Sequence, residues 1–194
     1  MSSRSFLLLH GLCGSPEGHW QSWLAGRLRA AGERVSFPDL PECDDPCPDA
    51  WRDALDNALA VLEGERIVIA HSLGCLLWVR RASASADGPL AERVLLVAPP
   101  DLEDVAPVVR FLSFEANPER VRAAAAETRI VCSDNDPYNP RGAVATFAEP
   151  LGLPADLIPG GGHLNLDAGY GPWPAVESWA LTGRASFGDA AIAV

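Results

Sequence analysis

One stretch, Arg66 to Cys75, constrains this chain more than any other, because an apolar run ends abruptly at a serine and good helix formers follow. The run before Ser72 is rich in β-branched residues, as expected for a buried strand. A strand that turns this tightly into a helix holds its central residue in an unfavourable backbone conformation. The pattern therefore predicts a strand, a sharp turn centred on Ser72, and a helix.

The residues around Ser72 have the sizes that such a turn requires. Ala70 and Gly74 lie two positions before and two positions after the serine, so that strand and helix can pass each other without a clash. The turn raises the serine oxygen above the sheet and directs the Leu73 amide toward the place where an oxyanion would form. A small residue, serine and glycine at this spacing also occur by chance, so the rest of the chain must supply a base, an acid and a second amide.

Composition excludes several classes of function. The chain has 194 residues, of which 48% are hydrophobic, and its formal charge is -11. A strongly acidic chain without a basic cluster argues against nucleic acid and anionic membranes as partners, because both require positive surface. We expect a soluble protein of the cytoplasm, since no run is long enough for a membrane span and the apolar start is too short for a signal peptide.

The five cysteines are odd in number, and free thiols fit a reducing compartment. Cys43 and Cys47 are the one pair with a spacing that suggests metal binding, but no second pair of Cys or His lies nearby to complete a tetrahedral site. We therefore expect neither a metal nor a cofactor.

Strand and helix patterns alternate six times along the chain, which is typical of a parallel sheet covered by helices on both faces. We predict a single α/β domain over residues 1–183, without a lid domain, and a loosely held tail over residues 184–194. Ser15 and Pro16 have the residue types of a helix start, so a helix should begin there. The predicted strands are Phe6–Leu9, Arg34–Phe37, Arg66–Ala70, Arg93–Val97, Thr128–Cys132 and Asp156–Ile158.

Polar residues follow four of these strands, and in parallel sheets ligands bind beyond the carboxyl ends of the strands. The Gly-rich turn His10 to Cys13 follows the first strand, Ser72 the third, Asp134 and Asp136 the fifth, and His163 the sixth. These groups should converge on one edge of the sheet.

A serine nucleophile needs a base within hydrogen-bond reach and a third group that orients the base. His163, in a run of glycines, is the histidine that lies downstream of both Ser72 and the acidic loop, as the order serine, acid, histidine requires. His71 should point away from the serine on the opposite side of the turn, while His10 and His19 could shape a pocket.

The acid is either Asp136 or Asp134, which share one loop. Pro137 favours an extended backbone at Asp136, while Asp134, nearer the strand end, could tie the loop together through its amides. We favour Asp136 and leave Asp134 as the alternative.

The sequence resembles the compact α/β-hydrolases grouped with retinoblastoma-binding protein 9 and the bacterial YdeN-type serine hydrolases. The likeness extends from about Phe6 to Leu181 and depends on five segments: the early Gly-rich turn with the following Gly18 to Trp23, Pro38 to Pro41, Ala70 to Gly74, Ser133 to Pro137, and Gly162-His163. The resemblance implies a lidless six-stranded sheet, a triad of Ser72, Asp136 and His163, and an oxyanion hole from the amides of Leu73 and Leu12. Ala70 departs from the glycine that is usual at this elbow position.

The expected function is cleavage of a small ester or related acyl bond through an acyl-enzyme intermediate, so the partner would be a small-molecule acyl substrate. Two alternatives stay open: an interaction protein with idle catalytic residues, and an acyltransferase or lyase that uses the same triad. Aromatic residues in loops at the active edge could form an acyl pocket, although loop aromatics more often pack locally; they are Phe111, Phe114, Tyr138, Tyr170 and Trp173.

Overall fold

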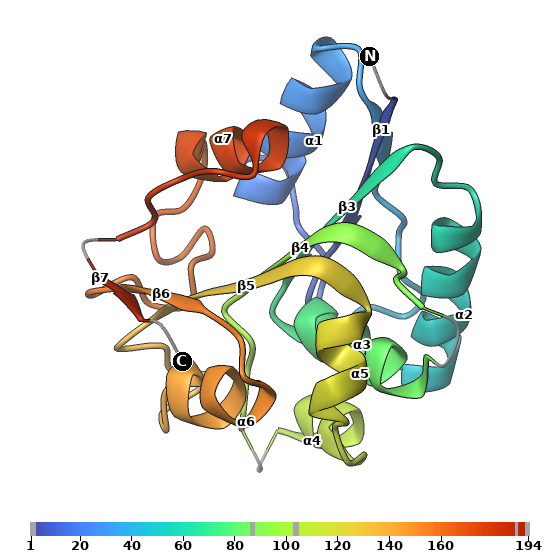
Figure 1. The fold of residues 1–194 in the computed structure, drawn as a ribbon. Helices are drawn as coiled ribbons and strands as arrows, with labels where there is room; N and C mark the ends of the chain where they lie inside the picture. Colours follow the sequence, from blue (N-terminus) through green and yellow to red (C-terminus); the bar gives the residue numbers. More distant parts are fainter. Residues whose placement is uncertain (1–2, 86–87, 103–104, 189, 193–194) are drawn as a thin grey trace.

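The computed structural model describes residues 3–85, 88–102, 105–188 and 190–192. It forms a single α/β domain around one twisted sheet of seven strands in the order β2-β1-β3-β4-β5-β6-β7 (Figure 1). The strands are β1 Arg4–Leu9, β2 Arg34–Ser36, β3 Glu65–His71, β4 Ala91–Val97, β5 Ala125–Ser133, β6 Ala155–Ile158 and β7 Ala190–Ile192. All six predicted strands are present, and every pairing among them is parallel.

Helices cover both faces of the sheet. Helices α1 (Trp20–Ala30) and α7 (Pro174–Thr182) pack on one face (Figure 1). The other face is covered by α2 Pro48–Ala60, α3 Leu73–Ala84, α4 Ala106–Leu112, α5 Pro118–Ala123, the π-helical turn Val144–Ala148 and the short α6 Glu149–Leu151. Every helix in the described part of the chain is too short or too polar to cross a bilayer.

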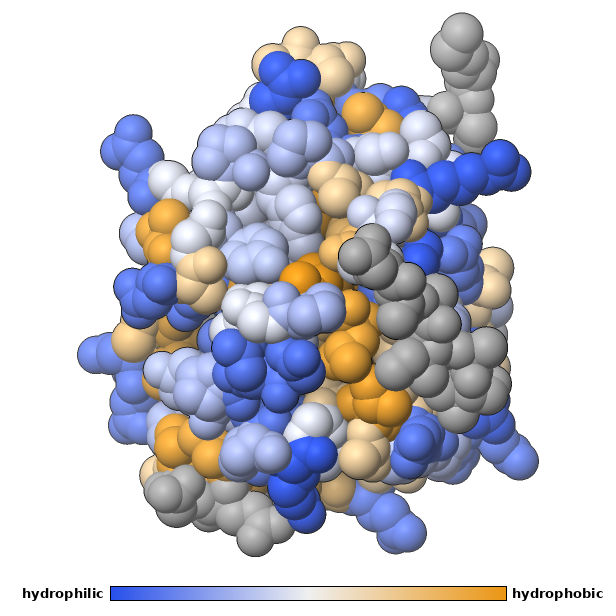
Figure 2. All heavy atoms as spheres, turned by 90° about the vertical axis from the view of Figure 1, so that its left-hand side faces the viewer, coloured by the Kyte–Doolittle hydropathy of each residue, from blue (hydrophilic) through white to orange (hydrophobic). Residues whose placement is uncertain are grey.

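The two core clusters follow from the alternation of side chains along each strand. In β1, Leu7 and Leu9 face the α3 side, whereas Phe6 and Leu8 face the side of α1 and α7. Both faces are therefore apolar, which explains why the central strands are continuous apolar runs in the sequence. Figure 2 shows that the outer surface is different, since the face at the left of Figure 1 is mostly hydrophilic with apolar residues gathered in a central strip.

The structure describes residues 184–188 and 190–192 of the predicted tail, and part of this segment packs on the domain. Phe187 is buried with 8% of its surface exposed, and its ring packs 5.9 Å from the ring of Trp173. Strand β7 then pairs antiparallel with β6 at the edge of the sheet. A three-residue edge strand made only of small and aliphatic residues carries no pattern of its own, which is why the sequence did not reveal it.

The start of the first helix also differs from the prediction. Helix α1 begins at Trp20 with His19 as its N-cap, and the Ser15 hydroxyl instead donates a hydrogen bond to the side-chain oxygen of Gln21 at 2.7 Å. Gly18, at φ +88°, turns the chain just before the helix, so the residues that look like a helix start belong to a loop.

Candidate active site

Ser72 lies in the tight turn between β3 and α3, with φ 53° and ψ −125°. This left-handed conformation is costly for a residue with a side chain and is held here by close packing. A Cβ at Gly74 would lie 2.6 Å from the Leu9 carbonyl oxygen, and a Cβ at Gly11 would lie 2.6 Å from the Cβ of Ser72. The elbow is therefore wedged against the end of β1, and only glycine fits at these two positions.

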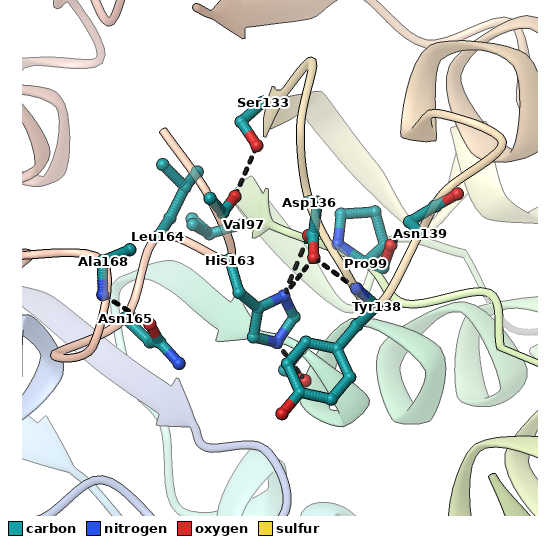
Figure 3. A network of polar contacts seen from close by, with 12 residues as sticks. Val97, Pro99, Ser133, Asp136, Tyr138, Asn139, His163, Leu164, Asn165 and Ala168 are labelled. Carbon is teal, nitrogen blue, oxygen red and sulfur yellow. Dashed lines mark hydrogen bonds and ion pairs between the residues drawn. The ribbon is translucent and has the colours of Figure 1, made fainter. Parts of the chain in front are cut away.

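The structure brings Ser72, His163 and Asp136 together. The Ser72 Oγ lies 2.9 Å from His163 Nε2, and His163 Nδ1 lies 2.9 and 2.8 Å from the two carboxylate oxygens of Asp136 (Figure 3). A carboxylate can only accept, so Nδ1 carries the proton of the neutral ring and Nε2 accepts from the serine hydroxyl. All three residues are buried, with 5 to 8% of their surface exposed.

The two candidate acids occupy different places in the same loop. Asp136 contacts the imidazole and also accepts a hydrogen bond from the Tyr138 amide at 2.8 Å. Asp134 is exposed and accepts instead from the Gly160 amide at 2.7 Å. Beside it, Asn135 accepts from the Gly162 amide at 2.7 Å. Asp134 and Asn135 thus fasten the loop that carries His163, and only Asp136 reaches the ring.

The two expected oxyanion donors lie beside the serine. Leu73 is the first residue of α3, where amides have no intrahelical acceptor. Leu12 lies in the turn after β1 and lines the same cavity as Ser72. That turn is anchored by the amide of Cys13, which donates to the Cys43 carbonyl at 2.6 Å.

His10 supports the same turn from inside the fold. Its Nδ1 donates to the Gly11 carbonyl at 2.8 Å, while its Nε2 accepts from the Leu40 amide at 3.0 Å. The Gly11 carbonyl belongs to the same peptide group as the Leu12 amide, so this contact orients the amide. Burial lowers the pKa of His10, which keeps the ring neutral and able to make both bonds.

His71 does not point away from the site, contrary to our expectation. Its Nε2 lies 3.0 Å from the backbone carbonyl of His163, and its ring lies 5.0 Å from the ring of His163 and 5.1 Å from that of His19. Burial, and after it the neighbouring His163 and His19, hold the pKa of His71 well below its ordinary value. The neutral ring donates to the carbonyl and braces the loop that carries the base.

Ser72 opens into a cavity of about 350 Å³. Of the five loop aromatics, Tyr138 lines it, with its ring 4.5 Å from the ring of His163 (Figure 3). Phe111 is fully buried in the core, and Trp173 packs against Trp20. The segment 99–117, a candidate pocket wall in the sequence because it follows the carboxyl end of a strand, supplies the aliphatic residues Pro100, Val105 and Val108 to the cavity. Single aliphatic residues in a Pro- and Asp-rich stretch carry no periodic signal, so only the structure identifies which residues of this segment line the cavity.

The described residues contain no cluster of three or more His, Cys, Asp or Glu side chains able to hold a metal ion. All five cysteines are free thiols, and Cys75 and Cys132 are buried. Burial raises the pKa of Cys132 to about 12. Neither of these buried thiols lines the cavity beside Ser72.

Comparison with known families identifies the chain. The family model described as serine hydrolase matches residues 6–181, almost the whole domain. The chain belongs to the serine hydrolase family. The hydrolase is 23% identical over 176 residues to YdeN of Bacillus subtilis (strain 168), covering 90% of this chain and 93% of the relative.

Solved structures agree on the fold of this serine hydrolase. The B. subtilis ydeN gene product superimposes with a TM-score of 0.80 at 22% identity, covering 93% of this chain and 97% of that one. A YdeN-like hydrolase from Pectobacterium atrosepticum gives 0.74 at 24% identity, covering 92% and 90%. A structure from work on carboxylesterases of the thaumarchaeon Nitrososphaera gargenis gives 0.61 at 13% identity, covering 83% of each chain. The expected resemblance to YdeN-type hydrolases and the α/β-hydrolase fold are confirmed.

Proposed function

We propose that this serine hydrolase is a carboxylesterase that cleaves small esters, with Ser72 as nucleophile, His163 as base and Asp136 as the group that orients the base. The observation that carries the proposal is the continuous hydrogen-bonded chain from the Ser72 hydroxyl through the imidazole to the Asp136 carboxylate. A hydroxyl alone is a poor nucleophile at neutral pH, and an adjacent oriented base is what activates it.

The reaction proceeds in two halves. Ser72 Oγ attacks the ester carbon while His163 Nε2 takes the hydroxyl proton, and the oxyanion accepts hydrogen bonds from the amides of Leu12 and Leu73. The protonated imidazole then donates its proton to the departing alkoxide, which leaves as the alcohol. Water, deprotonated by the same imidazole, attacks the acyl-serine, and the imidazolium returns this proton to Ser72 Oγ as the acid is released. Asp136 stabilises the imidazolium in both halves.

The cavity favours a small, uncharged ester over a larger or charged substrate. The cavity is small, its wall beside α4 is aliphatic, and the described residues that line it include neither lysine nor arginine. The carboxylesterases named among the structural neighbours have the same fold, which is consistent with this substrate class. We also propose a cytoplasmic location, on the composition alone.

Labelling with a fluorophosphonate tests the proposal directly. The wild-type protein should be labelled and should hydrolyse p-nitrophenyl acetate, and Ser72→Ala should lose both properties. Ser83→Ala serves as a matched control, because Ser83 lies at the far end of α3. An unlabelled wild-type protein would favour an idle site. Transfer of the acyl group to an added alcohol in preference to water would favour an acyltransferase.

A further inference from the structure

The cavity beside Ser72 has two chemically different walls. The wall beside α4 is aliphatic and includes Val105 and Val108. Other residues that line the cavity are polar, among them His19 and Asn165. A hydrocarbon acyl chain would contact only the aliphatic residues. The polar residues of the lining therefore need another explanation.

The hydrogen bonds of His19 fix the position of its proton. As N-cap of α1, its Nδ1 accepts the Gln21 amide proton at 3.1 Å, so this nitrogen carries no proton. Burial, and after it the nearby His163, lowers the pKa of His19 to about 4. The ring is therefore neutral and its proton is on Nε2. Within the described part of the chain, the Nε2–H group has no acceptor, although only 4% of the residue is exposed.

Asn165 presents a second donor to the same cavity. Its side-chain oxygen accepts the Ala168 amide proton at 3.1 Å, and this contact identifies the oxygen end of the side chain. The amide nitrogen points away from Ala168 (Figure 3) and donates to no acceptor among the described residues. Two residues that line the cavity thus each carry an N–H group whose direction is set by a helix or turn contact.

We propose that His19 Nε2–H and Asn165 Nδ2–H bind an acceptor oxygen in the alcohol part of the substrate, so that the preferred esters are those of oxygen-bearing alcohols. This inference rests on the proposed esterase function. The alcohol is the part concerned because it leaves beside His163 Nε2, which protonates it. Asn165 lies two residues after that base, and the His71 ring connects the rings of His163 and His19. His19 is buried, and a buried donor left without a partner is costly, so its Nε2–H group discriminates against alcohols that lack an acceptor.

Two pairs of esters of matched shape test the proposal. The first pair is 2-methoxyethyl butanoate and butyl butanoate, which differ by one oxygen in the alcohol. The second pair is butyl 3-methoxypropanoate and butyl pentanoate, which differ by one oxygen in the acyl chain. Initial rates are followed by acid release, and the quantity compared is the ratio of kcat/KM within each pair. Comparing that ratio between variants cancels differences in intrinsic reactivity.

Two substitutions of His19 separate binding from helix capping. In His19→Asn the side-chain oxygen can still cap α1, but no atom reaches the position of Nε2. In His19→Gln the amide nitrogen reaches that position, but the cap is lost. We expect His19→Asn to lower the alcohol-pair ratio about fivefold, the size of one neutral hydrogen bond, with an unchanged Tm. We expect His19→Gln to keep the ratio and to lower Tm by about 2–4 °C.

Three results would overturn the inference while ester cleavage itself persists. They are an unchanged alcohol-pair ratio in His19→Asn, a fall in the acyl-pair ratio instead, or ratios that follow Tm in both variants. Failure of the proposed function looks different: the wild-type protein would cleave none of the four esters, or Ser72→Ala would cleave them as well as wild type, and the inference would fall with it.

Discussion

Replacing Gly74 with alanine tests whether the elbow depends on close packing between α3 and β1. The added Cβ would lie 2.6 Å from the Leu9 carbonyl oxygen and 2.8 Å from that of His10. Both contacts are with backbone atoms, so neither can be relieved by a side-chain rotation. The start of α3 must therefore move away from β1 and take Ser72 with it.

The magnitude follows from two opposing effects. Alanine in place of glycine inside a helix is favourable by about 1 kcal/mol, whereas overpacking a rigid site costs about 1–3 kcal/mol. With two carbonyl groups in the way we expect the upper end of that range, so Gly74→Ala should lower the free energy of unfolding by about 2 kcal/mol. A nucleophile displaced by about 1 Å loses roughly a hundredfold in rate.

Gly26→Ala is the matched control. Gly26 also lies inside a helix, α1, but is exposed, and a Cβ there would meet no atom within 4 Å. This variant should be stabilised by about 0.5–1 kcal/mol. Urea unfolding followed by tryptophan fluorescence, together with p-nitrophenyl acetate hydrolysis, measures both effects. A Gly74→Ala protein as stable and as active as Gly26→Ala would refute the packing argument.

Three further predictions follow from the same contacts. Asp136→Asn should lower kcat by roughly 10³- to 10⁴-fold because the orientation of the base is lost. Asp134→Asn should lower kcat by less than about tenfold, since Asp134 only fastens the loop; kinetics showing the reverse order would exchange their roles. His71 and His19 have pKa values below the ordinary 6.5, with His19 at about 4. Because the unfolded chain then binds protons at a higher pH than the folded one, stability should be full above pH 6.5 and fall as the pH drops toward 4. Urea midpoints that stay constant over this window would contradict the lowered pKa values of the two rings. Phe187→Ala should cost about 3 kcal/mol in the free energy of unfolding, and a variant with the wild-type urea midpoint would show that the C-terminal segment adds nothing to the core.

Local patterns in the sequence determined most of the fold. The elbow at Ser72 was predictable because a strand, a small residue, a serine, a glycine and a helix follow one another within ten positions. The six parallel strands were predictable because strands buried on both faces are continuous apolar runs. The convergence of the Asp136 loop and His163 at one edge then followed from topology, since all of these groups come after carboxyl ends of parallel strands.

Only the tertiary structure decided which groups meet. The sequence favoured Asp136 but left Asp134 as an alternative in the same short loop. The two are separated by contacts with residues far away in the sequence, Asp134 with the Gly160 amide and Asp136 with His163. The inward position of His71 depends in the same way on its contacts with His163 and His19, which belong to other elements. A sequence pattern records the periodicity of a single element, whereas the direction of a side chain at the edge of a sheet is set by neighbours that no local pattern contains.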